Sequence, residues 1–321
     1  MAPPPGASWR PPALQPGIIP LRPIGLGEIY DGAFRAIRAN PRVMFGMSAI
    51  VVTIAVALQS LVSWYVEGLV ATQFDNLADE LDPQGVAGLS QTLSASVGQI
   101  SGLPITALAT TVLTGLLIVS VSRSVLGQVV SVRDVLRGGR VWLVVGFSLL
   151  LTVAVSLVLG LGAGLVALVG VRGDLGIAIL LGVVGLLAYV VGTFWVSVRT
   201  LLAAPALMLE GKGFWATVAR AWRLTRGVFW RLLGIWLLTT VLANFISAIF
   251  TVPAQLFAQL FLGDTAGRSF ASIAINGVAD VIALTLSTTF VAAVTALLYI
   301  DVRMRREGLD VELARAAEQT A

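Results

Sequence analysis

The chain has 321 residues, of which 57% are hydrophobic and 12% are charged, and its formal net charge is +4. A soluble domain is about 25% charged, so the composition predicts a membrane protein rather than a water-soluble fold. The absence of His and Cys excludes imidazole bases, thiol nucleophiles, disulfides and His–Cys metal sites, and Lys212 is the only lysine. We therefore expect neither an enzyme nor a cofactor.

The first 25 residues carry eight of the 13 prolines and show no helical period. They also lack the apolar core of a signal peptide. We expect residues 1–25 to form a disordered, partly polyproline-II tail. A solvated tail and a binding segment for a proline-recognising protein are both open interpretations.

Six apolar runs follow, each at least as long as the roughly 20 residues that a helix needs to cross a membrane. They are residues 43–66, 101–122, 141–170, 176–198, 232–252 and 272–300. None shows the two-residue alternation of a barrel strand. The predicted fold class is all-α, with residues 26–300 forming a membrane domain of six transmembrane helices in three hairpins. Residues 301–321 are predicted to form a charged C-terminal helix.

The basic residues lie almost entirely on one side of these spans. Of 21 Lys and Arg residues, 19 lie in residues 1–42, 123–140, 199–231 and 301–321, and the other two are Arg172 and Arg268. Because basic loops stay on the cytoplasmic side, both termini are predicted to be cytoplasmic, in a bacterial plasma membrane.

A short basic motif precedes the first, third and fifth spans. In each copy an apolar residue is followed by Arg-x-x-Arg, and the pairs are Arg35 and Arg38, Arg137 and Arg140, and Arg223 and Arg226. We expect an amphipathic helix in the inner interface before each hairpin, with these arginines on anionic lipid phosphates. Each would contribute about 1 kcal/mol near an anionic leaflet. A topology signal alone is the simpler alternative, and nothing in the pattern favours nucleic acid.

Three segments carry a resemblance to a known family. They are PGIIPLRPIGLGEIYDGAFRAIRANP (16–41), LLAAPALMLEGKGFWATVARAWRLTRGVFWRLLG (201–234) and LLYIDVRMRREGLDVELARA (297–316). They resemble an actinobacterial integral-membrane family labelled "glycerophosphoryl diester phosphodiesterase membrane domain-containing". The resemblance implies a six-helix membrane protein without an established activity. The phosphodiesterase chemistry of some relatives belongs to a separate soluble domain with catalytic histidines, so no catalytic residue is carried over.

Polar residues follow one face of each of the last two spans. Asn244, Ser247 and Thr251 lie on the fifth span, and Asn276 and Asp280 on the sixth. Since the two spans are consecutive, these side chains are predicted to share the outer half of the membrane. They would form either a polar pocket for a headgroup or solute, or hydrogen bonds that hold the helices together.

Close helix packing is predicted at Gly160 and Gly164, which form a small-xxx-small pair in the third span.

Three function classes remain after these exclusions, and the least favoured is an enzyme, for which only Asp, Glu, Ser, Tyr and Arg are available. The other two classes are non-catalytic. The first is a non-catalytic scaffold or accessory subunit with inner-leaflet lipid contacts, whose protein partner would bind the proline-rich tail or the C-terminal helix. The alternative is a transporter or lipid-handling protein that uses the pocket between the last two spans.

Overall fold

The computed structural model describes residues 22–81, 89–125, 140–171, 175–210, 213–263 and 269–308. This part of the chain is helical and contains no strand, as expected. The helices are α1 (Leu26–Ala39), α2 (Pro41–Leu81), α3 (Leu89–Val125), α5 (Val141–Val171), α6 (Leu175–Thr200), α7 (Ala203–Leu209), α8 (Phe214–Leu224), α9 (Phe229–Phe261) and α10 (Phe270–Glu307).

Six stretches are long and apolar enough to cross a membrane, which confirms the predicted class. They are Pro41–Ala71, Ser94–Ser122, Val141–Gly170, Gly176–Leu209, Phe229–Phe261 and Phe270–Glu307. The helices run beyond several of the apolar runs. In particular, α10 continues to Glu307, so the first charged residues after Ile300 extend the last span's own helix.

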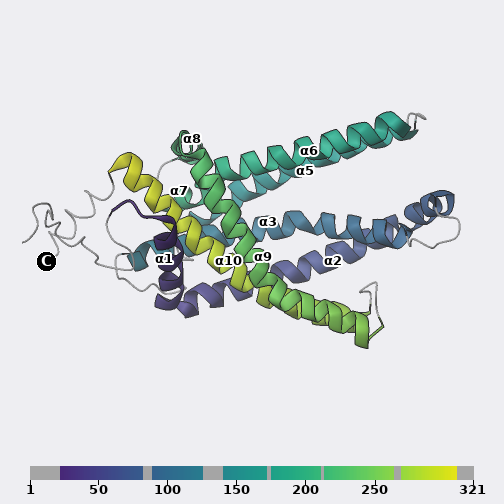
Figure 1. The fold of residues 1–321 in the computed structure, drawn as a ribbon, viewed down its shortest axis with the longest axis horizontal. Coiled ribbons are helices and arrows are strands. Elements are labelled where there is room, and N and C mark those ends of the chain that lie inside the picture. The colour runs from purple at the N-terminus through teal and green to yellow at the C-terminus, as the bar shows by residue number, and fades with distance from the viewer. Residues whose placement is uncertain are drawn as a thin grey trace, which may run out of the picture.

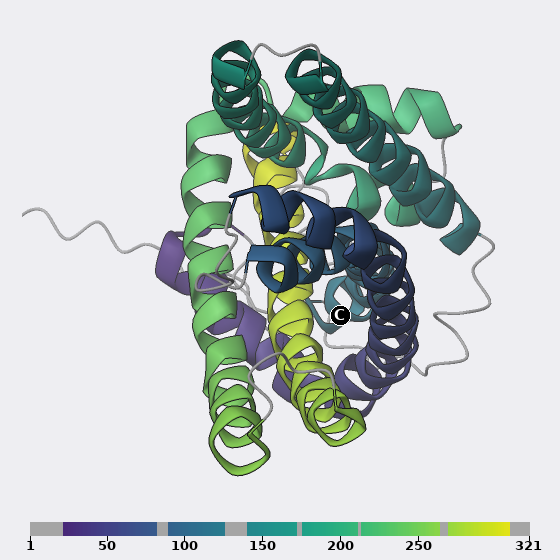
Figure 2. The same ribbon diagram turned by 90° about the vertical axis from the view of Figure 1, so that its right-hand side faces the viewer.

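The long helices pack as neighbours in chain order, and α10 lies at the centre (Figures 1 and 2). α2 packs along α3, α5 along α6 and α9 along α10, while α10 also contacts α1, α2 and α3. α1, α7 and α8 cover one end of the bundle, and the α5–α6 pair diverges from α3 toward the other end. The main apolar core therefore lies at the end that carries the short helices.

Local sequence explains where several helices begin and end. The Glu28 carboxylate accepts the Gly25 backbone N–H at 2.7 Å, which satisfies a donor before the first turn of α1. Pro41 occupies the first position of α2, where its missing N–H costs nothing. Gly308 ends α10 in the left-handed region, at φ 65°, which a glycine adopts without a steric penalty.

Close helix contacts occur at glycines, but at other glycines than expected. A Cβ added at Gly102 on α3 would lie 2.5 Å from the Gln59 side chain of α2, and one at Gly115 would lie 2.7 Å from Val144 of α5. Gly160 and Gly164 have no neighbour within 4 Å of an added Cβ, so the prediction of close packing at this pair is wrong. The small residues are there, but α3 diverges from this part of α5, and α6 contacts α5 at other residues, such as Val166.

The apolar face of α1 lies against protein. Ile29 and Ala33 are fully buried. Tyr30 stacks on Phe290 of α10, and Phe34 contacts the same ring at a tilt of 36°, with ring centroids 6.0 and 5.5 Å away. This amphipathic helix therefore covers the centre of the bundle with one face, and its charged face is left to the surface.

Candidate functional site

A fully buried carboxylate, Asp301 in the last turns of α10, joins three distant parts of the chain. Its Oδ1 accepts the Ile24 backbone N–H and the Arg305 Nε–H, both at 3.0 Å, and its Oδ2 accepts from Arg231 of α9. Both guanidinium groups also donate to the Ile24 carbonyl, at 3.1 Å from Arg231 and 2.9 Å from Arg305. The segment before α1 is thus fixed to α9 and α10 through both polar backbone groups of Ile24.

The physics of burial explains why these four residues occur together. A carboxylate removed from water loses several kcal/mol of solvation, which only well-placed donors offset. Asp301 receives those donors from two arginines and a backbone N–H. We call Ile24, Arg231, Asp301 and Arg305 the Asp301 cluster.

A second buried network lies beside the Asp301 cluster. Glu210 is almost fully buried and accepts from the Tyr299 hydroxyl at 2.7 Å and from Arg220 of α8 at 2.9 Å. Arg220 also pairs with Glu307, which Arg303 binds at 2.9 Å. The hydrogen bond to Glu307 raises the pKa of the Arg220 guanidinium, although partial burial acts in the opposite direction. This network ties α7, α8 and α10 together.

Another cation at this end, Arg199 at the end of α6, lies among aromatic rings. Its guanidinium carbon is 5.7 Å from the ring centroids of Trp195 and Trp222 and 5.4 Å from that of Phe229. It also donates to the Thr225 hydroxyl at 3.1 Å. Cation–π contacts of this kind hold a partly desolvated arginine in place without a carboxylate.

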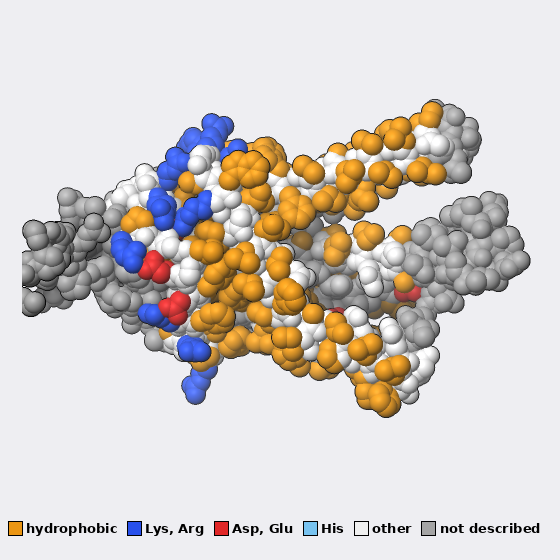
Figure 3. Space-filling model, viewed as in Figure 1, with side chains coloured by type: hydrophobic (Ala, Val, Ile, Leu, Met, Phe, Trp, Pro, Cys, Tyr) orange, Lys and Arg blue, Asp and Glu red, His pale blue; other side chains and the backbone are white. Residues whose placement is uncertain are grey.

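The surface of this end is basic (Figure 3). Lys and Arg side chains gather over the end that carries α1 and α8, and hydrophobic side chains predominate along the spans beyond it. Of the arginines expected at lipid headgroups, five are exposed here: Arg35, Arg38, Arg140, Arg223 and Arg226. Arg137 lies outside the described residues.

The contacts of these arginines differ. Arg35 pairs with Asp31 at 2.5 Å, and Arg140 lies 3.4 Å from the Met208 carbonyl. Within the described ranges, the side chains of Arg38, Arg223 and Arg226 have no hydrogen-bond or ion-pair partner. These three charges are therefore available to an external anion.

The structure does not join the polar stripes of the last two spans. Asn244 donates at 2.8 Å to the Thr240 carbonyl, and Thr251 at 3.2 Å to the Ser247 carbonyl, both within α9. On α10, Asp280 is half-buried, and the Asn276 Oδ1 is buried without a hydrogen-bond partner. No hydrogen bond links the two stripes among the residues that the structure describes. Neither stripe lines the cavities described below.

The clusters at the basic end are ion-pair networks that connect helices. The carboxylates of Glu210, Asp301 and Glu307 each accept from at least one arginine. Across the described ranges, no three His, Cys, Asp or Glu side chains lie close enough to hold a metal ion. Ion pairs therefore connect the helices at this end, and the unpaired arginines lie on its surface.

A comparison with known protein families tests the family resemblance seen in the sequence. Residues 175–319 match the family described as "Membrane domain of glycerophosphoryl diester phosphodiesterase". The expected family resemblance is thereby confirmed for this part of the chain. The description refers to a membrane domain and assigns no catalysis to it. No curated protein and no solved structure matches the chain significantly.

The residues of this chain that match the family begin with α6 and continue past the end of α10, to residue 319. They include the Glu210 network and every member of the Asp301 cluster except Ile24. Sequence reasoning missed both sets. The available signal was a pair of acidic residues, Glu210 and Asp301, each at the edge of an apolar run, and Asp301 has an arginine four residues later.

Proposed function

We propose that this chain is a non-catalytic membrane scaffold or accessory subunit whose basic end lies in the headgroup region of an anionic inner leaflet. The observation that carries this proposal is the meeting of unpaired arginines and exposed tryptophans at the same end. Trp142, Trp215 and Trp230 are 77%, 69% and 80% exposed. Tryptophan is enriched at headgroup depth, where its ring is partly in lipid and its N–H can meet water.

The arginines suit the anionic side of such an interface. Arg223 lies in the last turn of α8 and Arg226 lies in the turn that follows it, between Trp215 and Trp230 in sequence. Each basic residue near an anionic leaflet contributes about 1 kcal/mol, so the three unpaired arginines together give a substantial attraction. We therefore place the basic end, and with it both termini, on the cytoplasmic side of a bacterial plasma membrane.

The buried ion pairs suit a scaffold. They bind the segment before α1, α7, α8, α9 and α10 into one rigid end beneath the arginines. A protein partner would reach this end through residues 1–25 or the C-terminal segment after Gly308. The competing lipid-handling function has little support at the α9–α10 stripe, where Asn244 and Thr251 hydrogen-bond within their own helix.

The test is the double variant Arg223→Glu and Arg226→Glu, purified with its native lipid. Reversing the two charges should lower the ratio of anionic to zwitterionic lipid retained by the protein, measured by lipid mass spectrometry. Each reversal removes an attraction of roughly 1 kcal/mol and adds a repulsion.

The matched control is Gln255→Glu with Gln259→Glu, which adds negative charge at two exposed positions near the opposite end of α9. Lipid retention should be unchanged in the control. An unchanged ratio in the arginine variant, or an equal loss in both proteins, would contradict the proposal.

A further inference from the structure

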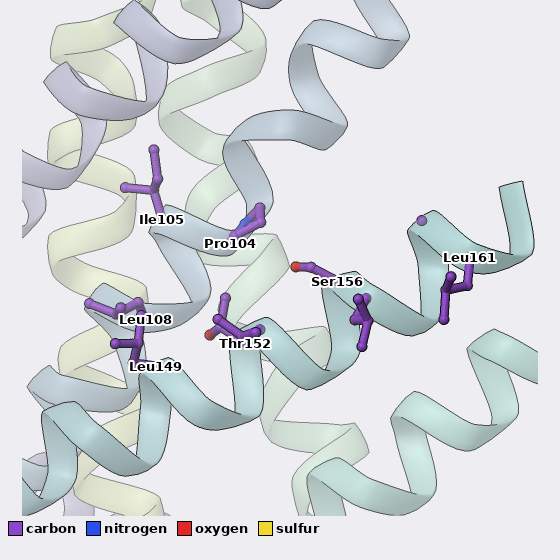
Figure 4. A pocket seen from close by; sticks show the side chains of 10 residues that line it. Pro104, Ile105, Leu108, Leu149, Thr152, Ser156 and Leu161 are labelled. Carbon is purple, nitrogen blue, oxygen red and sulfur yellow. The ribbon is translucent and has the colours of Figure 1, made fainter. Parts of the chain in front are cut away.

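An apolar groove runs between α3 and α5 at the depth of the membrane spans. Its volume is about 620 Å³, and apolar side chains such as Ile105, Leu108, Leu149 and Leu157 line it. Figure 4 shows Pro104 and Leu108 of α3 facing Leu149 and Thr152 of α5 across this groove. Both walls belong to transmembrane stretches, so the medium outside the groove is hydrocarbon.

A second cavity of about 420 Å³ adjoins the groove and reaches deeper into the bundle. It lies between α3, α5 and α6 and extends to Trp236 of α9 and Thr295 of α10. Pro104, Thr152 and Ser156 line both spaces, so the groove and the second cavity adjoin at these residues. Both volumes fall in the range of about 300–1,000 Å³ typical of small-molecule sites.

The inner cavity is lined by ten hydroxyl side chains. Six of them have no hydrogen-bond partner among the described residues: Thr152, Ser156, Tyr189, Thr193, Ser197 and Thr295. In Figure 4 the Ser156 hydroxyl points from α5 toward α3, near Pro104. These groups can therefore donate to a ligand.

The remaining four hydroxyls present acceptors. Thr110, Thr111, Thr114 and Thr200 donate to carbonyls of their own helices, at 2.8 to 3.0 Å, and keep free lone pairs on their oxygens. Pro104 adds to this set because it has no N–H to donate to the Ile100 carbonyl one turn earlier, and both residues line the cavity. The cavity thus offers donors and acceptors in an environment where an unsatisfied polar group is costly.

Charge separates this site from the basic end, because no charged side chain lines either space. We propose that the groove and the inner cavity together bind a membrane lipid with an uncharged, hydroxyl-bearing headgroup. The acyl chain lies in the α3–α5 groove, and the headgroup enters the inner cavity from the side. An anionic phospholipid does not fit, since its phosphate would be desolvated without a cation to pair with.

The experiment uses the full chain in phosphatidylcholine nanodiscs with a photoactivatable diacylglycerol, whose acyl chain carries the reactive group. Crosslinked peptides are mapped by mass spectrometry. Labelling should concentrate on the groove-lining parts of α3 and α5, and a photoactivatable phosphatidylglycerol should label them less. Equal labelling by the two probes, or labelling spread evenly over α5 and α6, would overturn the proposal.

Two glycines provide a matched pair of variants. Gly160 lines the groove and Gly162 does not, and both have nothing within 4 Å of an added Cβ. Gly160→Leu should fill the groove and lower diacylglycerol labelling by about fivefold, the scale of one lost hydrogen bond or packed group. Gly162→Leu should leave labelling unchanged. An equal effect of the two substitutions would overturn the assignment of the groove.

The hydroxyls are tested by Thr152→Val with Ser156→Ala, which keeps the shape of the cavity and removes two polar groups. Labelling by diacylglycerol should fall while labelling by a photoactivatable hydrocarbon should not. The control is Thr53→Val on the exposed face of α2, where the hydroxyl donates only to the Ala49 carbonyl. If the double variant binds diacylglycerol as the unchanged protein does, the headgroup does not occupy the inner cavity.

Discussion

α10 and α6 are both long apolar helices, yet they occupy opposite positions in the bundle. Their most apolar stretches have mean hydropathies of 2.2 and 2.5, but 72% of that stretch is buried in α10 and 6% in α6. Hydropathy therefore identifies a membrane span and does not say whether the span meets protein or lipid. In a membrane, moving an apolar side chain from lipid onto a protein surface changes its free energy little, because both surroundings are apolar.

Side-chain size explains the difference between them. Most of the buried residues in the middle of α10 are alanine, serine or threonine, which allow neighbouring backbones to approach closely. α6 instead presents exposed large residues such as Leu180, Leu187 and Val191. The charged end of α10 also carries the Asp301 cluster, in which a buried carboxylate binds arginines. At the end of α6, Arg199 contacts aromatic rings and a threonine hydroxyl instead of a carboxylate.

The largest effect is expected at the buried end of α10. Asp301→Ala leaves Arg231 and Arg305 without their common carboxylate and the Ile24 N–H without an acceptor. Removing one partner of a buried ion pair costs about 3–5 kcal/mol. The free energy of unfolding in detergent should fall by that amount.

The matched control is Asp31→Ala at the same end, which removes an exposed pair with Arg35. Its cost should stay within about 1 kcal/mol. Similar losses in the two variants would mean that the Asp301 cluster contributes no more than a surface ion pair.

A medium effect is expected from side-chain size alone. Ala293→Leu places a larger side chain at a fully buried position of α10, and overpacking there should cost about 1–3 kcal/mol. Ala188→Leu makes the same change on the exposed face of α6 and should stay within about 0.5 kcal/mol. Thermal unfolding of both variants in one detergent measures the difference. Equal midpoints would show that α10 is no more tightly packed than α6.

The smallest effect on stability is expected at Tyr30, which attaches α1 to the rest of the bundle. The Tyr30 hydroxyl lies 3.1 Å from the Thr239 Oγ1 and 3.3 Å from the Ile235 carbonyl of α9. Tyr30→Phe removes these contacts and should cost about 0.5–1.5 kcal/mol. Tyr65→Phe, on an exposed face of α2, is the control and should be neutral in the same unfolding measurement. If Tyr30→Phe leaves the free energy of unfolding unchanged, the apolar contacts of α1 alone attach it to the bundle.

The sequence by itself determined the class of the molecule and the position of its spans. Hydrocarbon offers no hydrogen-bond partner, so a long apolar run must satisfy its backbone internally as a helix. The uneven distribution of arginines also predicted one basic end, and the structure gathers the exposed arginines of the described residues there. Local composition is enough for both predictions because each depends on the solvent around a segment.

Only the tertiary structure decided which residues meet. Asp301 binds Ile24, 277 positions earlier, and Arg231, 70 positions earlier, and no local pattern carries that pairing. The helical period predicted Asn244 on a polar face of its span but could not show that its amide hydrogen-bonds to the Thr240 carbonyl within the same helix. The hydroxyl-lined cavity arises from threonines, serines and one tyrosine on four different helices, each ordinary in its own sequence. The physical reason is common to all three cases: periodicity fixes the direction of a side chain around its own helix axis, while the packing of helices against one another decides what that side chain contacts.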